Sequence, residues 1–148
     1  MRHDQPPPEP LASAVGFLLS WNGQRMAHRF AEGLQPLGLR PPHFGVLSLI
    51  AARPGCAQHE IVERSMIDPS SMVRVIDELE EMGLAERRID PEDRRRRAVH
   101  LSAAGKRRLE RARRVAAETV DEVLAPLDDD ERESLRLLLR KLAGAEDG

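Results

Sequence analysis

The segment from Asp90 to Gly105 constrains the fold of this chain more than any other. Four consecutive arginines, residues 94–97, lie between a turn-forming Asp-Pro pair and a short run of β-forming residues that leads into a helix start. Like charges at this density cannot enter a core, so the segment has to lie on the surface. At a hairpin tip, these guanidinium groups would suit phosphates or a narrow groove of DNA. A solvated, partly disordered loop is the alternative, and the residues before the loop weigh against it.

Two short helices joined by a turn precede the arginines. Apolar spacing predicts one helix over residues 58–65 and another over residues 68–82. Asp68 has the chemistry of an N-cap, Pro69 follows at the first helical position, and Gly83 ends the second helix. The pair is typical of a helix-turn-helix, with an ordinary helical hairpin in a bundle as the alternative.

The first turns of the second helix carry residues suited to DNA. Ser70 and Ser71 are small and polar, and they lie beside free backbone N–H groups that attract phosphate oxygens. Arg74, one turn further on, has the reach to contact a guanine edge or a phosphate. A surface ion pair with Glu78, four residues later, is the alternative for Arg74. We expect all three of these residues to contact DNA.

A hairpin directly follows the two helices. Its two strands are predicted at residues 84–89 and 98–101, and the turn between them, residues 90–97, carries the arginines. A hairpin in this position is the wing of a winged helix-turn-helix, so the charge run has a place beside a capped recognition helix. We therefore favour DNA contact over a solvated loop.

The four arginines of the turn need not share one role. We expect Arg94 and Arg95 to enter a groove, and Arg96 and Arg97 to contact phosphates. Asp93 is close enough in sequence to hold one guanidinium in a bidentate pair and so orient it for the minor groove.

The rest of the chain predicts a mainly α fold with this small β wing. Helical spacing begins at Leu11 and runs to about residue 34, and a second helix enters at the Pro-Pro pair 41–42 and stops near residues 53–55. Ser102 caps a long helix. Asp128, three residues before Glu131, opens the last helix with a capping box.

These elements divide into three regions. Residues 1–10, with four prolines, predict a disordered tail. Residues 36–101 form the winged helix-turn-helix lobe, and residues 11–35 and 102–146 form a helical dimerisation region. The terminal helices exceed what the lobe needs for its own core, so a second copy would bury their apolar faces, intramolecular packing being the alternative. A twofold dimer places its recognition helices about 34 Å apart, which predicts an inverted-repeat operator on double-stranded DNA.

Composition and charge support this interpretation. The net charge is −2, yet residues 86–114 alone carry +7 and the remainder carries −9, which orients a polyanion toward one segment. The one cysteine, Cys56, excludes an internal disulfide, and no apolar run is long enough to cross a membrane, so we expect a cytoplasmic protein. No Ser/His/Asp constellation, metal-ligand cluster or glycine-rich phosphate loop occurs, so we expect neither an enzyme nor a cofactor.

Residues 41–105 resemble the winged helix-turn-helix of MarR-type transcriptional regulators. The most specific match is Asp90-Pro-Glu-Asp-Arg-Arg followed by Val99, Leu101, Ser102 and Gly105, supported by the segments 70–74 and 79–84. The resemblance implies a homodimer, usually a repressor, that releases DNA when a small, often aromatic or phenolic, ligand binds. It also implies that Arg95 is the wing-tip arginine, that Asp93 orients it, and that residues 70–74 belong to the recognition helix.

The ligand pocket implied by this resemblance lies between the dimer helices and the lobe. Its candidate residues come from the first two helices: Trp21, Arg25, His28, His43 and Phe44. The wing departs from the family pattern in having four arginines where about two are expected. A winged-helix module that binds protein instead of DNA is the second functional hypothesis, although such a module has no need of an arginine-loaded wing.

Overall fold

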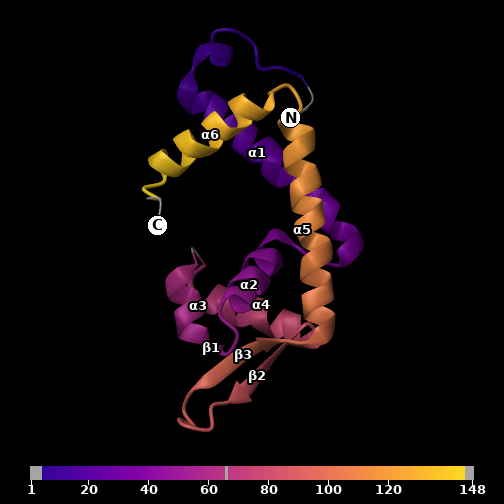
Figure 1. The fold of residues 1–148 in the computed structure, drawn as a ribbon, viewed down its shortest axis with the longest axis vertical. Helices are drawn as coiled ribbons and strands as arrows, with labels where there is room; N and C mark the ends of the chain where they lie inside the picture. The colour runs from indigo at the N-terminus through magenta and orange to yellow at the C-terminus, as the bar shows by residue number, and fades with distance from the viewer. Residues whose placement is uncertain (1–4, 66, 146–148) are drawn as a thin grey trace. The chain divides into compact units, whose positions relative to one another are not determined.

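The computed structural model describes residues 5–65 and 67–145 (Figure 1). The expected tail therefore lies partly outside the described residues. In chain order, the elements are a 3-10 turn (Leu11–Ser13), α1 (Val15–Leu34), a second 3-10 turn (Gln35–Leu37), α2 (Pro41–Ala52), β1 (Cys56–Ala57), α3 (Gln58–Arg64), α4 (Pro69–Glu81), β2 (Ala85–Ile89), β3 (Arg97–Leu101), α5 (Ala103–Val123) and α6 (Asp129–Leu142). The mainly helical fold with a small wing is confirmed. Along the described ranges, no helix is long and apolar enough to span a membrane.

The chain forms two compact units. One comprises Ala27–Ala116, and the other combines the residues up to Met26 with those from Ala117 onward. We refer to the first as the lobe and to the second as the terminal unit. Both α1 and α5 pass from one unit into the other.

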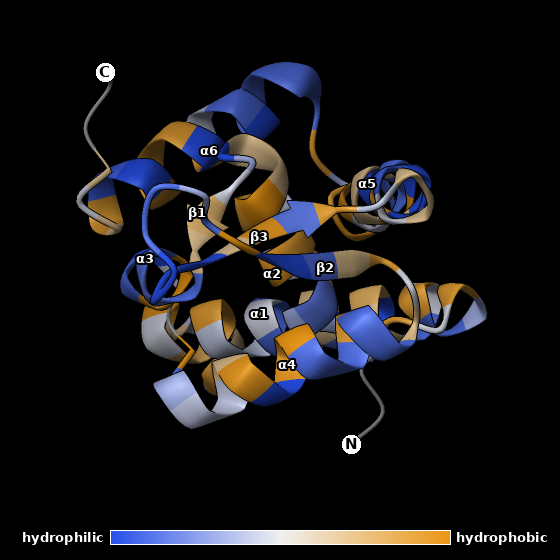
Figure 2. Cartoon of the chain, turned by 90° about the horizontal axis from the view of Figure 1, so that it is seen from below, coloured by the Kyte–Doolittle hydropathy of each residue, from blue (hydrophilic) through white to orange (hydrophobic). Residues whose placement is uncertain are grey.

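The lobe packs α2, α3 and α4 on an antiparallel sheet with strand order β1-β3-β2 (Figure 1). Its centre consists of apolar side chains with at most 2% exposure, among them Leu47, Ile50, Ile61, Met72, Ile76, Leu79, Leu84, Val99 and Leu109. The amphipathic helices and hairpin of the sequence therefore close over one core. Figure 2 shows that α4 carries apolar residues on one face and hydrophilic residues on another.

The sheet has one strand more than the sequence predicted. In β1, Cys56 pairs with Val99 and Ala57 pairs with Ala98. A two-residue strand is too short to show alternation, so the sequence pattern carried no signal for it. Gly55 adopts φ +78°, a conformation that favours glycine, and its N–H donates to the Val99 carbonyl at 3.0 Å. This turn brings the start of α3 against the wing.

The predicted helix caps are present. The Asp68 carboxylate accepts the N–H of Ser71, the Ser102 hydroxyl accepts that of Gly105, and the capping box of Asp128 with Glu131 forms in both directions. At the other end of α4, Gly83 has φ +70°. The chain turns there into β2, so α4 and the wing follow each other with a fixed geometry.

The terminal unit contains much exposed apolar surface. Its large apolar side chains with more than 40% exposure are Leu11, Val15, Leu19, Val120, Leu137, Leu138, Leu139 and Leu142. The first helix was expected from residue 11, but the structure has a 3-10 turn there and the α-helix begins at Val15. Within this unit, Arg132 of α6 pairs with Asp121 of α5 at 2.9 Å.

Candidate nucleic-acid interface

The N-terminus of α4 is organised around Asp68. One of its carboxylate oxygens accepts the Ser70 hydroxyl at 2.7 Å and the Ser71 N–H at 3.0 Å. These hydrogen bonds, that of the Ser70 hydroxyl most strongly, hold the pKa of Asp68 well below its usual value. Both serines are therefore at the exposed start of the helix, as the sequence predicted, but the proton of the Ser70 hydroxyl points to Asp68. In this arrangement the Ser70 oxygen is left to act as an acceptor.

Arg74 lies on the exposed face of α4, and its guanidinium has no partner among residues 5–65 and 67–145. The alternative partner, Glu78, is engaged elsewhere: it binds His43 Nε2 at 2.6 Å and the Arg40 guanidinium. The His43 ring, 4% exposed, accepts the Arg40 N–H on Nδ1, so Nε2 donates to Glu78. The hydrogen bond from His43, followed by that from Arg40, lowers the pKa of Glu78. Arg74 therefore remains available to a ligand.

The wing tip has a defined turn. The Asp90 N–H donates to the Arg96 carbonyl at 3.1 Å, and the Arg96 N–H donates to the Asp93 carbonyl at 3.0 Å. The Asp93 side chain accepts the backbone N–H of Arg95 at 2.9 Å. The expected bidentate pair between Asp93 and a guanidinium is absent from the described residues. An aspartate in a turn readily bonds the backbone two residues on, and this short-range contact satisfies Asp93 instead.

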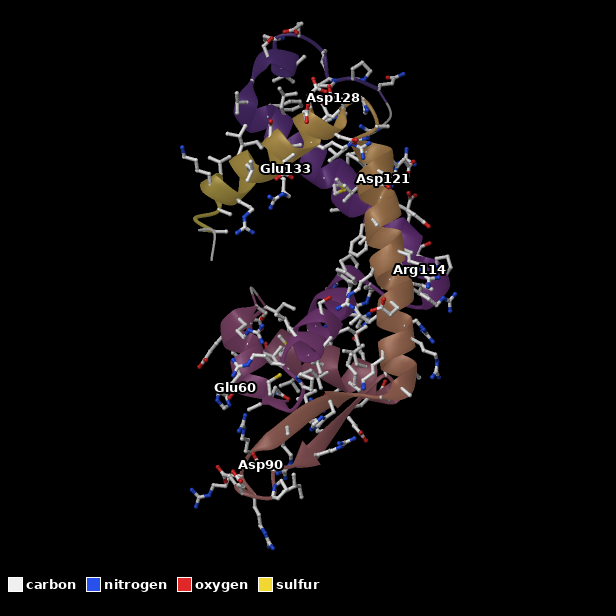
Figure 3. The ribbon with its side chains drawn as sticks, viewed as in Figure 1. Glu60, Asp90, Arg114, Asp121, Asp128 and Glu133 are labelled. Atoms are coloured by element: carbon white, nitrogen blue, oxygen red, sulfur yellow. The ribbon has the colours of Figure 1, made fainter. Side chains whose placement is uncertain are left out.

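The four arginines have different surroundings. Arg96 donates to Glu60 of α3 at 3.0 Å and to Asp90 at 3.4 Å. Figure 3 shows Asp90 at the hairpin tip and Glu60 at the end of α3 nearest to it. The Arg97 guanidinium donates to the Arg94 carbonyl at 2.9 Å. The exposed guanidinium groups of Arg94 and Arg95 have no partner within the described ranges.

Arg96 has ion-pair partners that the sequence did not predict, while its expected contact with a phosphate stays a prediction. Its side chain is 35% exposed, and both of its carboxylate partners are less exposed. The sequence could not reveal this because Glu60 is 36 residues away and meets Arg96 only through the tertiary fold. In the structure Arg96 connects the wing tip to α3.

A second arginine, Arg87 of β2, was missed by the sequence analysis. Its guanidinium donates to Asp77 at 2.7 Å and Glu80 at 2.8 Å, both on α4, and to Gln58 of α3 at 3.1 Å. The sequence pattern that could have revealed it is the alternation of the strand, which places residue 87 on the same face as the buried Ala85. A charged residue on an inward face requires partners of opposite charge. Arg87 joins the wing to both helices of the helix-turn-helix.

The five candidate pocket residues belong to both units. In the terminal unit, Trp21 stacks on Phe17 with ring centroids 5.9 Å apart, and Arg25 is half-buried. In the lobe, Phe44 packs edge-on against Phe30 at 5.1 Å, exposed His28 pairs with Glu32 at 3.4 Å, and buried His43 belongs to the Glu78 cluster.

The lobe itself contains a pocket of about 420 Å³. It is lined by Ile50, Ala51, Pro54, His100, Leu101, Lys106, Leu109, Glu110 and Arg113. The lining combines apolar side chains of α2, β3 and α5 with charged groups of α5, where Arg113 pairs with Glu110 at 2.5 Å. Across the described ranges, no cluster of three or more potential metal ligands occurs.

A capped helix with an exposed polar face, next to a wing with two unpaired arginines, defines a winged helix-turn-helix protein. The sequence profile of the MarR family matches residues 37–96. A protein of Thauera aromatica, named as a candidate transcriptional regulatory protein for the hcr operon, is 36% identical over 134 residues, which cover 89% of this chain and 80% of that protein. The chain belongs to the MarR family of transcriptional regulators.

Solved structures agree with this assignment. The repressor CouR bound to a 23-mer DNA duplex superposes with a TM-score of 0.82 at 32% identity, covering 91% of this chain and 96% of CouR. The structure of CouR from Rhodococcus jostii RHA1 bound to p-coumaroyl-CoA superposes with a TM-score of 0.79 at 29% identity. The match covers 95% of this chain and 99% of that chain. The winged-helix fold of the chain is thus also that of CouR, which has been solved both with a DNA duplex and with p-coumaroyl-CoA.

Proposed function

We propose that this protein is a dimeric, sequence-specific DNA-binding repressor that a small molecule releases from its operator. The observation that carries the proposal is the pairing of an exposed α4 face with unpaired arginines at the wing tip. Ser70, Ser71 and Arg74 would lie in the major groove, and Arg94 and Arg95 in the adjacent minor groove or on its phosphates. Arg97 is exposed and would contact a phosphate, whereas Arg96 and Asp93 would hold the wing in shape.

Dimerisation is the second part of the proposal. The terminal unit exposes large leucines and valines, several of them on α6, and burying them against a second copy would stabilise a dimer. We assign residues 11–35 and 102–146 to the dimerisation region and residues 36–101 to DNA binding. A twofold arrangement would present two lobes to an inverted repeat.

The third part concerns the effector. The CouR complex with p-coumaroyl-CoA supports an aromatic or phenolic effector for this chain as well. Two locations are open to test: the residues Trp21, Arg25, His28, His43 and Phe44 that the family resemblance implies, and the lobe pocket. The lobe pocket has the size of a small-molecule site and combines Leu101 and Leu109 with the cation of Lys106, while its other cation, Arg113, pairs with Glu110 of the same lining at 2.5 Å. An aromatic carboxylate would match the leucines and Lys106, and would have to compete with Glu110 for Arg113.

The test is selection of bound fragments from genomic DNA by the full-length protein, followed by fluorescence anisotropy on the enriched sequence. We expect an inverted repeat, a complex of two chains per duplex by light scattering, and affinity that falls steeply with salt as condensed counterions are released. Absence of any enriched sequence, or a complex insensitive to salt, would refute the proposal and favour a protein-binding winged helix. Phenolic acids are then screened for release of DNA from the operator.

A further inference from the structure

The exposed face of α4 includes one apolar side chain. Met72, Val75, Ile76 and Leu79 are buried, whereas the residues of the opposite face between 70 and 81 are exposed: Ser70, Val73, Arg74, Asp77 and Glu81. Every exposed member of this set is polar or charged except Val73, which is 41% exposed. Val73 lies one turn after Ser70 and directly before Arg74, in the middle of the face that we assign to the major groove.

The turn that carries Val73 is held firmly. Arg87 donates to the Val73 carbonyl at 3.4 Å, and the same guanidinium binds Asp77 and Glu80. Valine is β-branched and has one strongly preferred χ1 rotamer in a helix. The two methyl groups of Val73 are therefore presented in a fixed direction, and little side-chain entropy is lost when they meet a surface.

The charges next to Val73 permit the close approach of a polyanion. The Asp77 carboxylate, one turn beyond Val73, would repel phosphates, but the Arg87 guanidinium lies 2.7 Å from it. Arg74, adjacent to Val73, has no carboxylate partner among the described residues. The Arg74 guanidinium can therefore attract a phosphate beside Val73, while the exposed carboxylate of Glu81 lies about two turns further along the helix.

A single exposed apolar residue is ordinary on a protein surface, so its position has to carry the argument. The floor of the major groove consists of hydrogen-bond donors and acceptors and one apolar group, the C5-methyl of thymine. A valine pressed against any other base edge would bury polar atoms without a hydrogen bond, which is unfavourable. Val73 at the centre of the reading face therefore selects for thymine.

We propose that Val73 contacts the methyl group of a thymine in each operator half-site and makes that position specific. This inference rests on the proposed function, because it requires α4 to lie in the major groove. It assigns to Val73 a part of the sequence specificity that Ser70, Ser71 and Arg74 do not supply.

The test replaces each thymine of the selected operator, one symmetric pair at a time, by 2′-deoxyuridine, which lacks the C5-methyl. Removing one methyl contact per half-site should weaken binding of the wild-type protein roughly fourfold for each contact, or roughly fifteenfold for the symmetric pair, at one position and leave the other positions unchanged. Val73→Ala should bind the natural operator more weakly and lose the sensitivity at that position. Val73→Thr, which keeps one methyl group, should retain part of it.

Arg74→Ala is the matched control on the same helix. It should weaken binding to all the duplexes while keeping the response to deoxyuridine. Thermal unfolding of each variant checks the fold, and exposed Val73 is expected to tolerate substitution. A tightly bound operator with no deoxyuridine-sensitive position, or a sensitivity that persists in Val73→Ala, overturns the role of Val73 and leaves the proposed function intact. Failure to bind any DNA overturns both.

Discussion

Two neighbouring arginines of the wing provide the sharpest test of the interface. The Arg95 guanidinium is exposed and has no partner in the described part of the chain, whereas that of Arg96 is bound to Glu60 and Asp90. Substituting each by alanine removes one positive charge from the same loop. A charge run acting as a diffuse positive patch predicts equal effects on DNA binding, but the structure predicts different ones.

The expected changes in operator affinity and in folding stability follow from these contacts. Arg95→Ala should cost ~1–3 kcal/mol of operator affinity for each half-site, so a twofold dimer loses about twice that, and folding stability should not change. Arg96→Ala removes ion pairs at 3.0 and 3.4 Å in a side chain that is 35% exposed. Pairs at the surface contribute ~0.2–1 kcal/mol each, so the free energy of unfolding should fall by about 1 kcal/mol.

The assays are fluorescence anisotropy against a salt series and thermal or urea unfolding. Arg95→Ala should also reduce the salt slope by about one ion per chain. Arg95→Lys is the charge-matched control: it should keep the salt slope yet lose affinity where the planar guanidinium fits a narrow groove. Equal losses of affinity in Arg95→Ala and Arg96→Ala, with neither variant losing stability, would refute the division of roles between the two residues.

Two further predictions concern stability. In Gly105→Ala, the new Cβ would lie 1.9 Å from the Leu84 carbonyl oxygen, so the junction of α5 with the wing has to move. The movement disturbs the hydrogen bonds at this junction, and the free energy of unfolding measured in urea should fall by about 2–4 kcal/mol. Gly45→Ala, on α2 where the new Cβ meets open space, is the control, and its free energy of unfolding should rise by ~0.5–1 kcal/mol. Equal changes in stability in the two variants would contradict the close contact at Gly105. Because the pKa of Asp68 is lowered in the folded state, mainly by the Ser70 hydroxyl, its carboxylate stabilises the fold above the unfolded pKa near 4 and loses this effect as pH falls toward the folded pKa. The melting temperatures of the wild type and Asp68→Ala should therefore converge on acidification, and a gap that stays constant from neutral pH to pH 2 would rule out this role for the ionised cap.

The sequence determined the local structure because local structure depends on neighbouring residues. Asp68 and Pro69 specify the start of α4, Gly83 specifies its end, and the Asp-Pro turn before the arginines specifies the wing. These signals act over a few residues, through hydrogen bonds and backbone conformations that a side chain makes with its own segment. The helix-turn-helix followed by a hairpin was predictable for that reason.

The tertiary structure alone decided which arginines are free to bind DNA. Arg87 and Arg96 are of the same residue type as Arg74 and Arg95. Their partners on α3 and α4 lie 7 to 36 residues away, and Arg96 also binds Asp90 of its own turn. Strand alternation indicated only that Arg87 faces inward and needs partners. Which carboxylates lie within ion-pair distance depends on packing in space, which no local pattern encodes. The sequence therefore determined that the wing carries arginines, and the packing of the wing against α3 and α4 decided which of them the protein uses to hold itself together.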